Sequence, residues 1–301
     1  MQVRGRRKLA AALVLVLGVA LLVAPHVGTE RPYRSPGPLP TFPPGATVLL
    51  AVGDVGTCAD TNDDAVAALA AHLPGTIALL GDIVYPDGGI SDYERCFDPA
   101  WGPLRSRLRP AQGNHDFESA SASGYFDYFA GAAGTPGQGW YSYDLGTWHV
   151  IVLNSDCAGV GGCGAGSPQL AWLEADLSAH PAVCTLAYWH HPRYSSGEFG
   201  NDPRTEPLWH ALAVAGADLV LSGHNHDYER LAPIDGIRSF VVGTGGHSLI
   251  AFTRPPDAHT ELRADDSYGL LALDLRDGSY TWQFVPIPGD ALDDSGSATC
   301  H

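Results

Sequence analysis

The chain has 301 residues, 45% of them hydrophobic, which is enough for a globular domain with a sizeable core and excludes wholesale disorder. It contains 33 acidic and 17 basic residues, so its formal net charge is −16. This surplus of negative charge opposes phosphate neutralisation and docking on an anionic membrane. We therefore expect no nucleic-acid partner and no membrane-surface partner.

The first 30 residues have the pattern of a secretory signal peptide. Arg4, Arg6, Arg7 and Lys8 form a basic start, and an uncharged apolar run follows at 9–24. The run is shorter than the ~20 residues that span a bilayer comfortably, and an uncleaved N-terminal anchor is the alternative. Arg6 and Arg7 partly match a twin-arginine export signal. These features predict a secreted or cell-envelope protein.

Two short segments flank the expected domain at 47–288. Residues 31–46 are rich in proline and predict an extended linker after the signal segment at 1–30. Residues 289–301 predict a loose C-terminal tail, held in place if Cys300 is bonded.

Within the expected domain, apolar β-rich runs alternate with helical patterns. Strands are predicted at 47–53, 76–81, 148–154, 184–190, 218–223, 238–243, 268–275 and 280–285. Helices are predicted at 62–72, 168–179 and 203–215, with Ser167 as a cap of the second and Gly216 at the end of the third. Continuous apolar strands between helices favour an α/β domain with sheets buried on both faces. The last strands have no helix between them, which favours antiparallel pairing there.

Six cysteines and an export signal together favour disulfide bonds, with free buried thiols as the alternative. Cys157 and Cys163 flank a short glycine-containing loop that can close on itself. Sequence alone leaves many pairings open. The pairing that we expect is Cys58 with Cys96, Cys157 with Cys163, and Cys184 with Cys300.

Five polar clusters follow apolar runs, at points where strands are expected to end or chain turns to occur. They are GDVG (53–56), GDIVY (81–85), GNHD (113–116), WHHP (189–192) and GHNH (223–226). Any one cluster is weak evidence, because a lone histidine at a strand end is more often structural. Ligands of α/β sheets bind beyond the carboxyl ends of strands, and glycine permits tight turns there. The five clusters are therefore expected to converge on one place.

The donor side chains in these clusters have the chemistry of a two-metal site. They are Asp54, Asp82, Tyr85, Asn114, His190, His224 and His226. Asp82 has two carboxylate oxygens and is expected to bridge both ions, while His224 and His226 would each reach a different ion. Two adjacent ions can hold a hydroxide as nucleophile and clamp the oxygens of an in-line displacement at phosphorus.

The order of the five clusters resembles the metallophosphoesterase, or calcineurin-like phosphoesterase, superfamily over about 48–229. The resemblance implies a layered α/β/β/α sandwich of two mixed sheets flanked by helices, with metals at the carboxyl ends of strands. Gly56 stands where many members have a histidine ligand, and Tyr85 adds a phenol. This exchange, together with the sequence GHNHDYER at 223–230, resembles the pattern of the purple acid phosphatases.

That resemblance implies two different metal ions. Fe(III) is expected at Asp54, Asp82, Tyr85 and His226. The second ion, Fe(II), Zn or Mn, is expected at Asp82, Asn114, His190 and His224. A phenol with a pKa of about 10 needs a strongly acidic ion to ionise at neutral pH, which agrees with trivalent iron. The alternative for Tyr85 is simple packing beside Pro86.

The resemblance also implies residues that act on the phosphate. His115 and Asp116 are the candidate catalytic residues: His115 would face the phosphate and assist the leaving oxygen, and Asp116 would orient its ring. The alternative for His115 is a structural role. Asn114 and His115 are expected substrate contacts. His191 directly follows the candidate ligand His190, and we expect it either to contact the substrate or to support the ligands from behind. The guanidinium of Arg193 is a further expected contact of a phosphate oxygen. A surface salt bridge is the alternative for Arg193. His247 is a weaker candidate for the rim, and the loop at 193–207 lacks the histidines that larger purple acid phosphatases place there.

Taken with the export signal, the resemblance predicts a secreted dinuclear-metal phosphoesterase that hydrolyses small-molecule phosphate monoesters, as acid phosphatases do, by attack of metal-bound hydroxide on phosphorus. One alternative is a phosphodiesterase or nucleotidase with the same metal site. Another is a non-catalytic module that binds metal or phosphate, although such members usually lack some ligands and this chain has candidates at every position.

Overall fold

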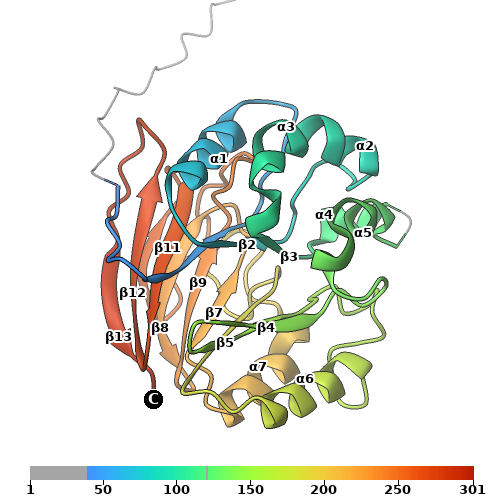
Figure 1. Ribbon diagram of the computed structural model, residues 1–301, viewed down its shortest axis with the longest axis vertical. Coiled ribbons are helices and arrows are strands. Elements are labelled where there is room, and N and C mark those ends of the chain that lie inside the picture. Colours follow the sequence, from blue (N-terminus) through green and yellow to red (C-terminus); the bar gives the residue numbers. More distant parts are fainter. Residues whose placement is uncertain (1–38, 120) are drawn as a thin grey trace, which may run out of the picture. The chain divides into compact units, whose positions relative to one another are not determined.

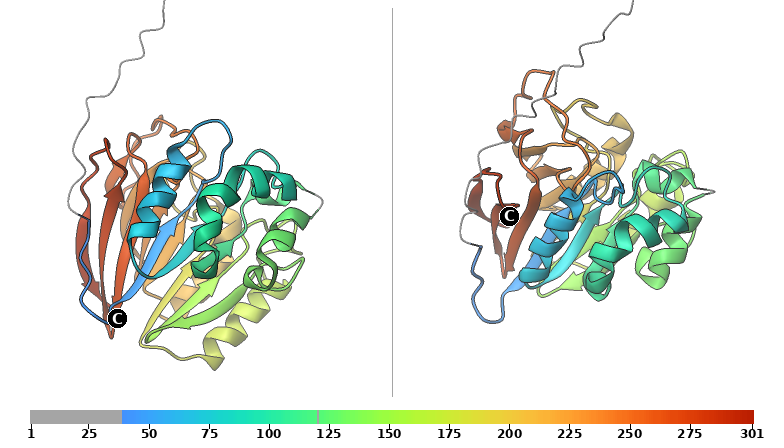
Figure 2. Two further views of the ribbon diagram at one scale, coloured as in Figure 1. Left: turned by 45° about the horizontal axis from the view of Figure 1, so that its top comes forward. Right: turned by 90° about the horizontal axis from the view of Figure 1, so that it is seen from above.

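The computed structural model describes residues 39–119 and 121–301. The expected signal segment and the first part of the expected linker, 31–38, lie outside the described residues. Two mixed sheets pack face to face, and helices cover the outer face of each sheet (Figures 1 and 2). The predicted α/β/β/α sandwich is therefore confirmed.

The first sheet contains parallel strands at one edge and antiparallel strands at the other. Its strand order is β13 (Ser295–Thr299), β12 (Ser279–Pro286), β11 (Gly269–Arg276), β1 (Thr47–Val52), β2 (Thr76–Leu80) and β3 (Leu108–Ala111). Strands β1, β2 and β3 run parallel, whereas β11, β12 and β13 pair antiparallel with their neighbours, as expected for the last part of the chain.

The second sheet has a parallel centre and antiparallel edges. Its strand order is β10 (Thr260–Ala264), β8 (Tyr228–Ile234), β9 (Ile237–Val242), β7 (Leu219–Ser222), β6 (Cys184–Tyr188), β5 (Trp148–Val152) and β4 (Tyr141–Leu145). Strands β5, β6, β7 and β9 are parallel. Every strand predicted from the sequence is confirmed, while β3, β4, β8, β10 and β13 were not predicted.

Alternate residues of the central strands face two different cores. In β1, Leu49 and Ala51 pack between the two sheets, whereas Leu50 and Val52 pack beneath the helices of the first sheet. All four side chains are fully buried. Because both faces of the strand are covered, the strand is a continuous apolar run rather than an alternating one.

The helices lie on the outer faces of the sheets. They are α1 (Asn62–His72), α2 (Ile90–Asp92), α3 (Asp98–Trp101), α4 (Asn114–Glu118), α5 (Ser123–Phe129), α6 (Pro168–Ala179) and α7 (Glu206–Val214). Apolar side chains of α1, α3 and α5 pack in one core against the first sheet. Those of α6 and α7 pack in another core against the second sheet. Ser167 caps α6 through a hydrogen bond from the Leu170 backbone amide at 3.3 Å, as predicted. Among the described residues, no helix combines the length and apolar character needed to cross a lipid bilayer.

The predicted loose tail is wrong for the last part of the chain. Residues Ser295–Thr299 form β13, which pairs antiparallel with β12 at the edge of the first sheet. The sequence SGSAT has no apolar run, so nothing local predicts a strand, and the pairing comes from the neighbouring strand.

The three expected disulfides are confirmed. They join Cys58 to Cys96, Cys157 to Cys163, and Cys184 to Cys300. The last one links β6 of the second sheet to the residue after β13 of the first sheet, across 116 positions of sequence. It therefore ties the two sheets together.

We expect the disulfide that links the sheets to contribute more stability than the short one. Replacing Cys184 and Cys300 by alanine should lower the free energy of unfolding by about 5 kcal/mol, because the bond closes a long loop in the unfolded chain. Replacing Cys157 and Cys163 opens a loop of only 6 positions and should cost about 2 kcal/mol. Urea denaturation of both double variants measures the two free energies of unfolding. An equal loss of stability in the two variants would contradict the larger contribution of the disulfide that links the sheets.

Candidate functional site

The five polar clusters converge where the strands of both sheets end. Asp54 follows β1, Asp82 follows β2 and Asn114 begins α4 just after β3, all from the first sheet. His190 follows β6 and His224 follows β7 in the second sheet. The expected convergence is therefore present, and the contacts below describe its geometry.

Four donor atoms form one compact group around the Tyr85 hydroxyl, here named the tyrosine group. The hydroxyl oxygen lies 3.1 Å from Asp54 Oδ1, 3.2 Å from Asp82 Oδ2 and 3.2 Å from His226 Nε2. His226 Nε2 lies 3.3 Å from Asp54 Oδ1. All four side chains are buried. They are the residues predicted for the first ion.

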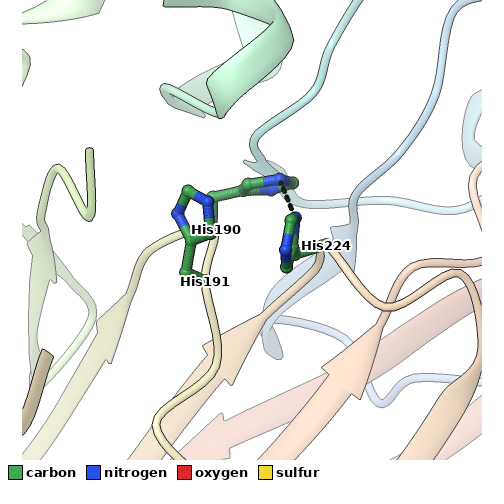
Figure 3. Close-up of side chains that lie close together, drawn as sticks. All are labelled: His190, His191 and His224. Carbon is green, nitrogen blue, oxygen red and sulfur yellow. Dashed lines mark hydrogen bonds between the residues drawn. The ribbon is translucent and has the colours of Figure 1, made fainter. Parts of the chain in front are cut away.

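A second set of donor atoms, here named the histidine group, shares Asp82 with the first. His190 Nε2 lies 3.1 Å from Asp82 Oδ2 and 3.2 Å from His224 Nδ1 (Figure 3). Asn114 Oδ1 is buried and has no hydrogen-bond partner in the described part of the chain. Since buried polar atoms are nearly always satisfied, a partnerless acceptor at this place fits a bound cation.

The carboxylates of Asp54 and Asp82 each accept a backbone hydrogen bond at one oxygen and present the other oxygen to the site. Asp54 Oδ2 accepts a hydrogen bond from the His224 backbone amide at 2.8 Å. Asp82 Oδ1 accepts one from the His115 backbone amide at 2.8 Å. The remaining oxygens, Asp54 Oδ1 and Asp82 Oδ2, are those of the tyrosine group. These backbone bonds fix the orientation of both carboxylates.

Backbone carbonyls orient two of the imidazoles in a similar way. His190 Nδ1 lies 2.9 Å from the carbonyl oxygen of Leu80, and His226 Nδ1 lies 2.9 Å from that of Ser248. A neutral ring that donates Nδ1–H to a carbonyl has a lone pair at Nε2, which is the usual arrangement for a metal-ligating histidine. The donor set and its supports therefore fit metal ions.

The backbone has to turn sharply to bring these side chains together. Asp54, Asp82 and His224 all have left-handed backbone angles, with φ of 59°, 47° and 69°. Gly113 passes so close to the site that a Cβ there would lie 2.1 Å from the Asp82 nitrogen. Gly81 combines φ of 86° with a Cβ position 2.6 Å from His190 Nδ1. No larger residue fits at either glycine without displacing a candidate ligand.

The clustered side chains shift one another's pKa. Burial opposes the ionised form of Asp82, but the His190 imidazole outweighs it and holds the pKa of that carboxyl well below its usual range. Burial also opposes the imidazolium of His190, yet Asp82 raises the pKa of His190 to about 9. Burial, then Asp54 and Asp82, raise the pKa of the Tyr85 phenol well above its ordinary value. A cation that binds here must displace these protons, so its binding strengthens as pH rises.

His115 lies at the edge of the site, as expected, but Asp116 does not orient it. His115 Nδ1 lies 2.6 Å from the Pro86 carbonyl oxygen, and its Nε2 lies 4.0 Å from Asp82 Oδ2. Asp116 is buried behind it and accepts from the Tyr93 hydroxyl at 2.6 Å and from the Gly113 amide at 2.9 Å. The predicted orienting role of Asp116 is wrong: it holds the backbone of the GNHD turn, which local sequence does not indicate.

The other candidate substrate-binding residues have different surroundings in the structure. His191 lies against the histidine group, with its ring centroid 4.3 Å from that of His224. Arg193 forms an ion pair with Glu206 and packs over the Tyr194 ring, so the alternative of a salt bridge is confirmed for it. His247 packs on the Tyr85 ring at 4.0 Å between centroids and lies nearer the site than expected.

Two residues next to the site were missed by sequence analysis. Ser155, after β5, is buried and bonds to His191. Phe199 is 49% exposed, and its ring centroid lies 4.7 Å from that of His224. The available sequence signal for Phe199 is an aromatic residue within the polar loop at 193–207, whereas a single serine after a strand gives none.

Fold and site together define a class of proteins: layered α/β/β/α sandwiches with a buried cluster of candidate metal-binding side chains at the strand ends. The sequence model of the calcineurin-like phosphoesterase family matches residues 47–228. The chain belongs to this family of phosphoesterases.

Several known proteins resemble this chain at low identity. Purple acid phosphatase 15 of Arabidopsis thaliana is 26% identical over 244 residues, which cover 66% of this chain and 45% of the relative. A nucleotide pyrophosphatase/phosphodiesterase of Hordeum vulgare is 24% identical over 241 residues, 64% of this chain and 63% of the relative. The structure of purple acid phosphatase PPD1 from yellow lupin (Lupinus luteus) seeds superposes with a TM-score of 0.73 at 21% identity, covering 88% of this chain and 55% of that one. The chain thus spans about half the length of such relatives, and the lupin structure shares its fold.

We expect metal ions to stabilise the fold through this cluster. Treatment with a chelator should lower the melting temperature, and adding back Zn²⁺, Mn²⁺ or Fe³⁺ should raise it, since a ligand at 100 times its Kd adds about 2.7 kcal/mol. Binding should release protons in weakly buffered solution, because His190 must lose one.

Calorimetric scans with two variants test the assignment. Asp82→Asn should remove the response to added metal, because Asp82 Oδ2 belongs to both groups. Asp127→Asn, at an exposed position of α5, should respond as the unaltered protein does. A response that persists in Asp82→Asn would place the metal elsewhere.

Proposed function

We propose that the protein hydrolyses phosphate monoesters at two adjacent metal ions. The observation that supports this most strongly is the shared position of Asp82 Oδ2, 3.2 Å from the Tyr85 hydroxyl and 3.1 Å from His190 Nε2. One carboxylate oxygen in contact with both groups suits two ions held side by side. Such a pair suits displacement at phosphorus.

The two groups differ in chemistry and so suit different ions. The tyrosine group offers oxygens from Asp54, Asp82 and Tyr85, with one nitrogen from His226. A phenol whose pKa is raised needs a strongly acidic ion to ionise, so we assign Fe(III) to this group. The histidine group offers two imidazoles, one carboxylate and an amide oxygen. This mixture suits Fe(II), Zn or Mn.

The chain's own residues would bind and orient the ester and move a proton. When bound, the two ions would supply positive charge and Lewis acidity at the phosphoryl group. The Pro86 carbonyl accepts Nδ1–H of His115, which leaves Nε2 directed toward the site beside Asp82. A protonated His115 can give its Nε2 proton to the leaving oxygen, so that an alcohol departs rather than an alkoxide.

We further propose a small-molecule phosphate ester as substrate and a location outside the cytoplasm. The net charge of −16 disfavours polyanionic partners at long range, while cations in the site would attract a single phosphate. Three disulfides suit an oxidising compartment. Recovery of the native chain solely from cytoplasm, with all cysteines reduced, would contradict the location.

The first test compares an aryl phosphate monoester with an aryl phosphate diester, using metal-loaded protein. We expect faster release of alcohol from the monoester, and loss of that activity in Asn114→Ala, because the variant lacks the buried amide oxygen of the histidine group. Faster cleavage of the diester would replace the proposal with a phosphodiesterase. No turnover of either ester, with metals bound, would contradict catalysis and favour a binding module.

The role of His115 is tested separately. His115→Ala should retain both metals and lower kcat by about 100-fold or more, the range typical for removal of a general acid. The loss of kcat in His115→Ala should be smaller for esters whose leaving alcohol is strongly acidic, because such an alcohol can leave without receiving a proton. Metal analysis accompanies the kinetics, and loss of metal in His115→Ala would overturn the assignment.

A further inference from the structure

His191 is buried against the histidine group, through ring contacts that could not be predicted from the sequence. The residue is 6% exposed, and its ring centroid lies 5.0 Å from that of His190 and 4.3 Å from that of His224 (Figure 3). A ring nitrogen of each of these histidines lies within 4.8 Å of one on each of the others. His191 therefore presents a polar atom to the histidine group.

Ser155 holds His191 at two points. Its Oγ accepts a hydrogen bond from the His191 backbone amide at 2.9 Å and lies 2.9 Å from Nδ1 of the same residue. Ser155 is completely buried, so its hydroxyl proton needs an acceptor inside the protein. Within residues 39–119 and 121–301, no further hydrogen bond of this hydroxyl is found. The proton must therefore point at Nδ1.

This proton count fixes the tautomer of His191. Nδ1 accepts from Ser155, so the neutral ring bears its proton on Nε2. A nitrogen with a proton cannot ligate a metal ion, but it donates hydrogen bonds to oxygen. A neutral ring also avoids repulsion from cations in the neighbouring groups, unlike an imidazolium. His191 is thus built as an uncharged donor beside the metal-binding side chains.

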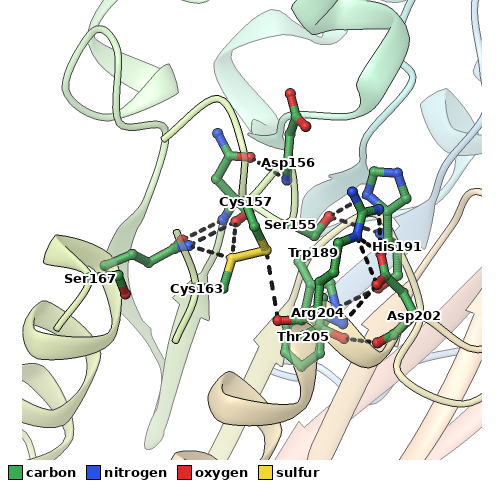
Figure 4. Close-up of a disulfide and its surroundings, with 12 residues drawn as sticks. Ser155, Asp156, Cys157, Cys163, Ser167, Trp189, His191, Asp202, Arg204 and Thr205 are labelled. Carbon is green, nitrogen blue, oxygen red and sulfur yellow. Dashed lines mark hydrogen bonds and ion pairs between the residues drawn. A yellow bond between two sulfur atoms is a disulfide. The ribbon is translucent and has the colours of Figure 1, made fainter. Parts of the chain in front are cut away.

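Hydrogen bonds and a disulfide hold the chain around Ser155 and His191. Asn154 donates its backbone amide to Gln169 Oε1 at 2.7 Å and accepts at its carbonyl from Gln169 Nε2 at 2.8 Å. The Cys157–Cys163 disulfide closes the loop that follows (Figure 4). On the other side, the Trp189 indole donates to the His191 carbonyl at 2.8 Å. The backbone of both partners is therefore held independently of their mutual bond.

We infer that His191 donates a hydrogen bond from Nε2–H to a phosphate oxygen of the substrate, and that Ser155 is the positioning residue that selects this tautomer. The inference rests on the proposed phosphoesterase function. A phosphate has only acceptor atoms to offer at its ionised oxygens, so a fixed donor is complementary to it. The guanidinium of Arg193 is engaged by Glu206, whereas no partner of the described chain occupies Nε2 of His191 through a hydrogen bond.

Binding of inorganic phosphate tests the inference without requiring turnover. Calorimetry on metal-loaded protein should give a dissociation constant about tenfold or more weaker for His191→Leu, the loss expected for a hydrogen bond to a charged group. His191→Gln should recover most of the affinity, because its amide nitrogen reaches the position of Nε2. His210→Gln, at an exposed position of α7, is the matched control and should bind as the unaltered protein does.

The role of Ser155 is tested by a double-mutant cycle with His191. Ser155→Ala should weaken phosphate binding in the unaltered background and have no further effect in His191→Leu, since its contribution passes through that ring. A purely structural role would instead add the same loss in both backgrounds. Melting temperatures of all variants exclude misfolding as the cause.

Three results would overturn the inference, and they are distinguishable. Loss of metal in His191→Leu would make His191 a ligand. Unchanged phosphate affinity in His191→Leu, together with ester hydrolysis by the unaltered protein, would refute the contact and leave the proposed function intact. If the unaltered, metal-loaded protein neither binds phosphate nor hydrolyses esters, the proposed function and the inference fail together.

Discussion

The contact between Asp82 and His190 is the constraint on which the rest of the site depends. The two side chains come from different sheets, are both buried, and meet at 3.1 Å between Oδ2 and Nε2. The first sheet and its loops supply all oxygen donors of the two groups, and the second supplies all the imidazoles. Neither sheet alone has a complete set of candidate ligands, so the candidate site is complete only where the two sheets are packed together.

The main elements of the fold were predictable because they are buried on both faces. Central strands such as β1 and β6 are uninterrupted apolar runs, and α6 has both a capping serine and the expected length. The strands that were missed include β3, β4, β10 and β13, which lie at the sheet edges. Edge strands are partly exposed, contain polar residues, and depend on a neighbour for pairing. Local sequence does not contain that information.

The candidate site likewise has residues that could be predicted from local sequence and residues that could not. The candidate ligands could be found because each belongs to a short polar cluster that follows an apolar run, and five such clusters in this order are distinctive. Their supports could not be found, since the carbonyls of Leu80 and Ser248 and the hydroxyl of Ser155 act through tertiary contact alone. Asp116 illustrates the difficulty: its neighbour in sequence is His115, but its partners in space are Tyr93 and the Gly113 amide.

The left-handed backbone at Asp54, Asp82 and His224 sets stability against activity in this protein. Non-glycine residues in such conformations cost of order 1–3 kcal/mol each, and glycine would relieve that cost. Three of the seven described non-glycine residues with positive φ angles are thus candidate metal ligands. Selection for heat resistance alone would favour variants that have lost their ligands, so stabilised relatives or engineered forms of this chain need to be screened for metal content as well as for melting temperature.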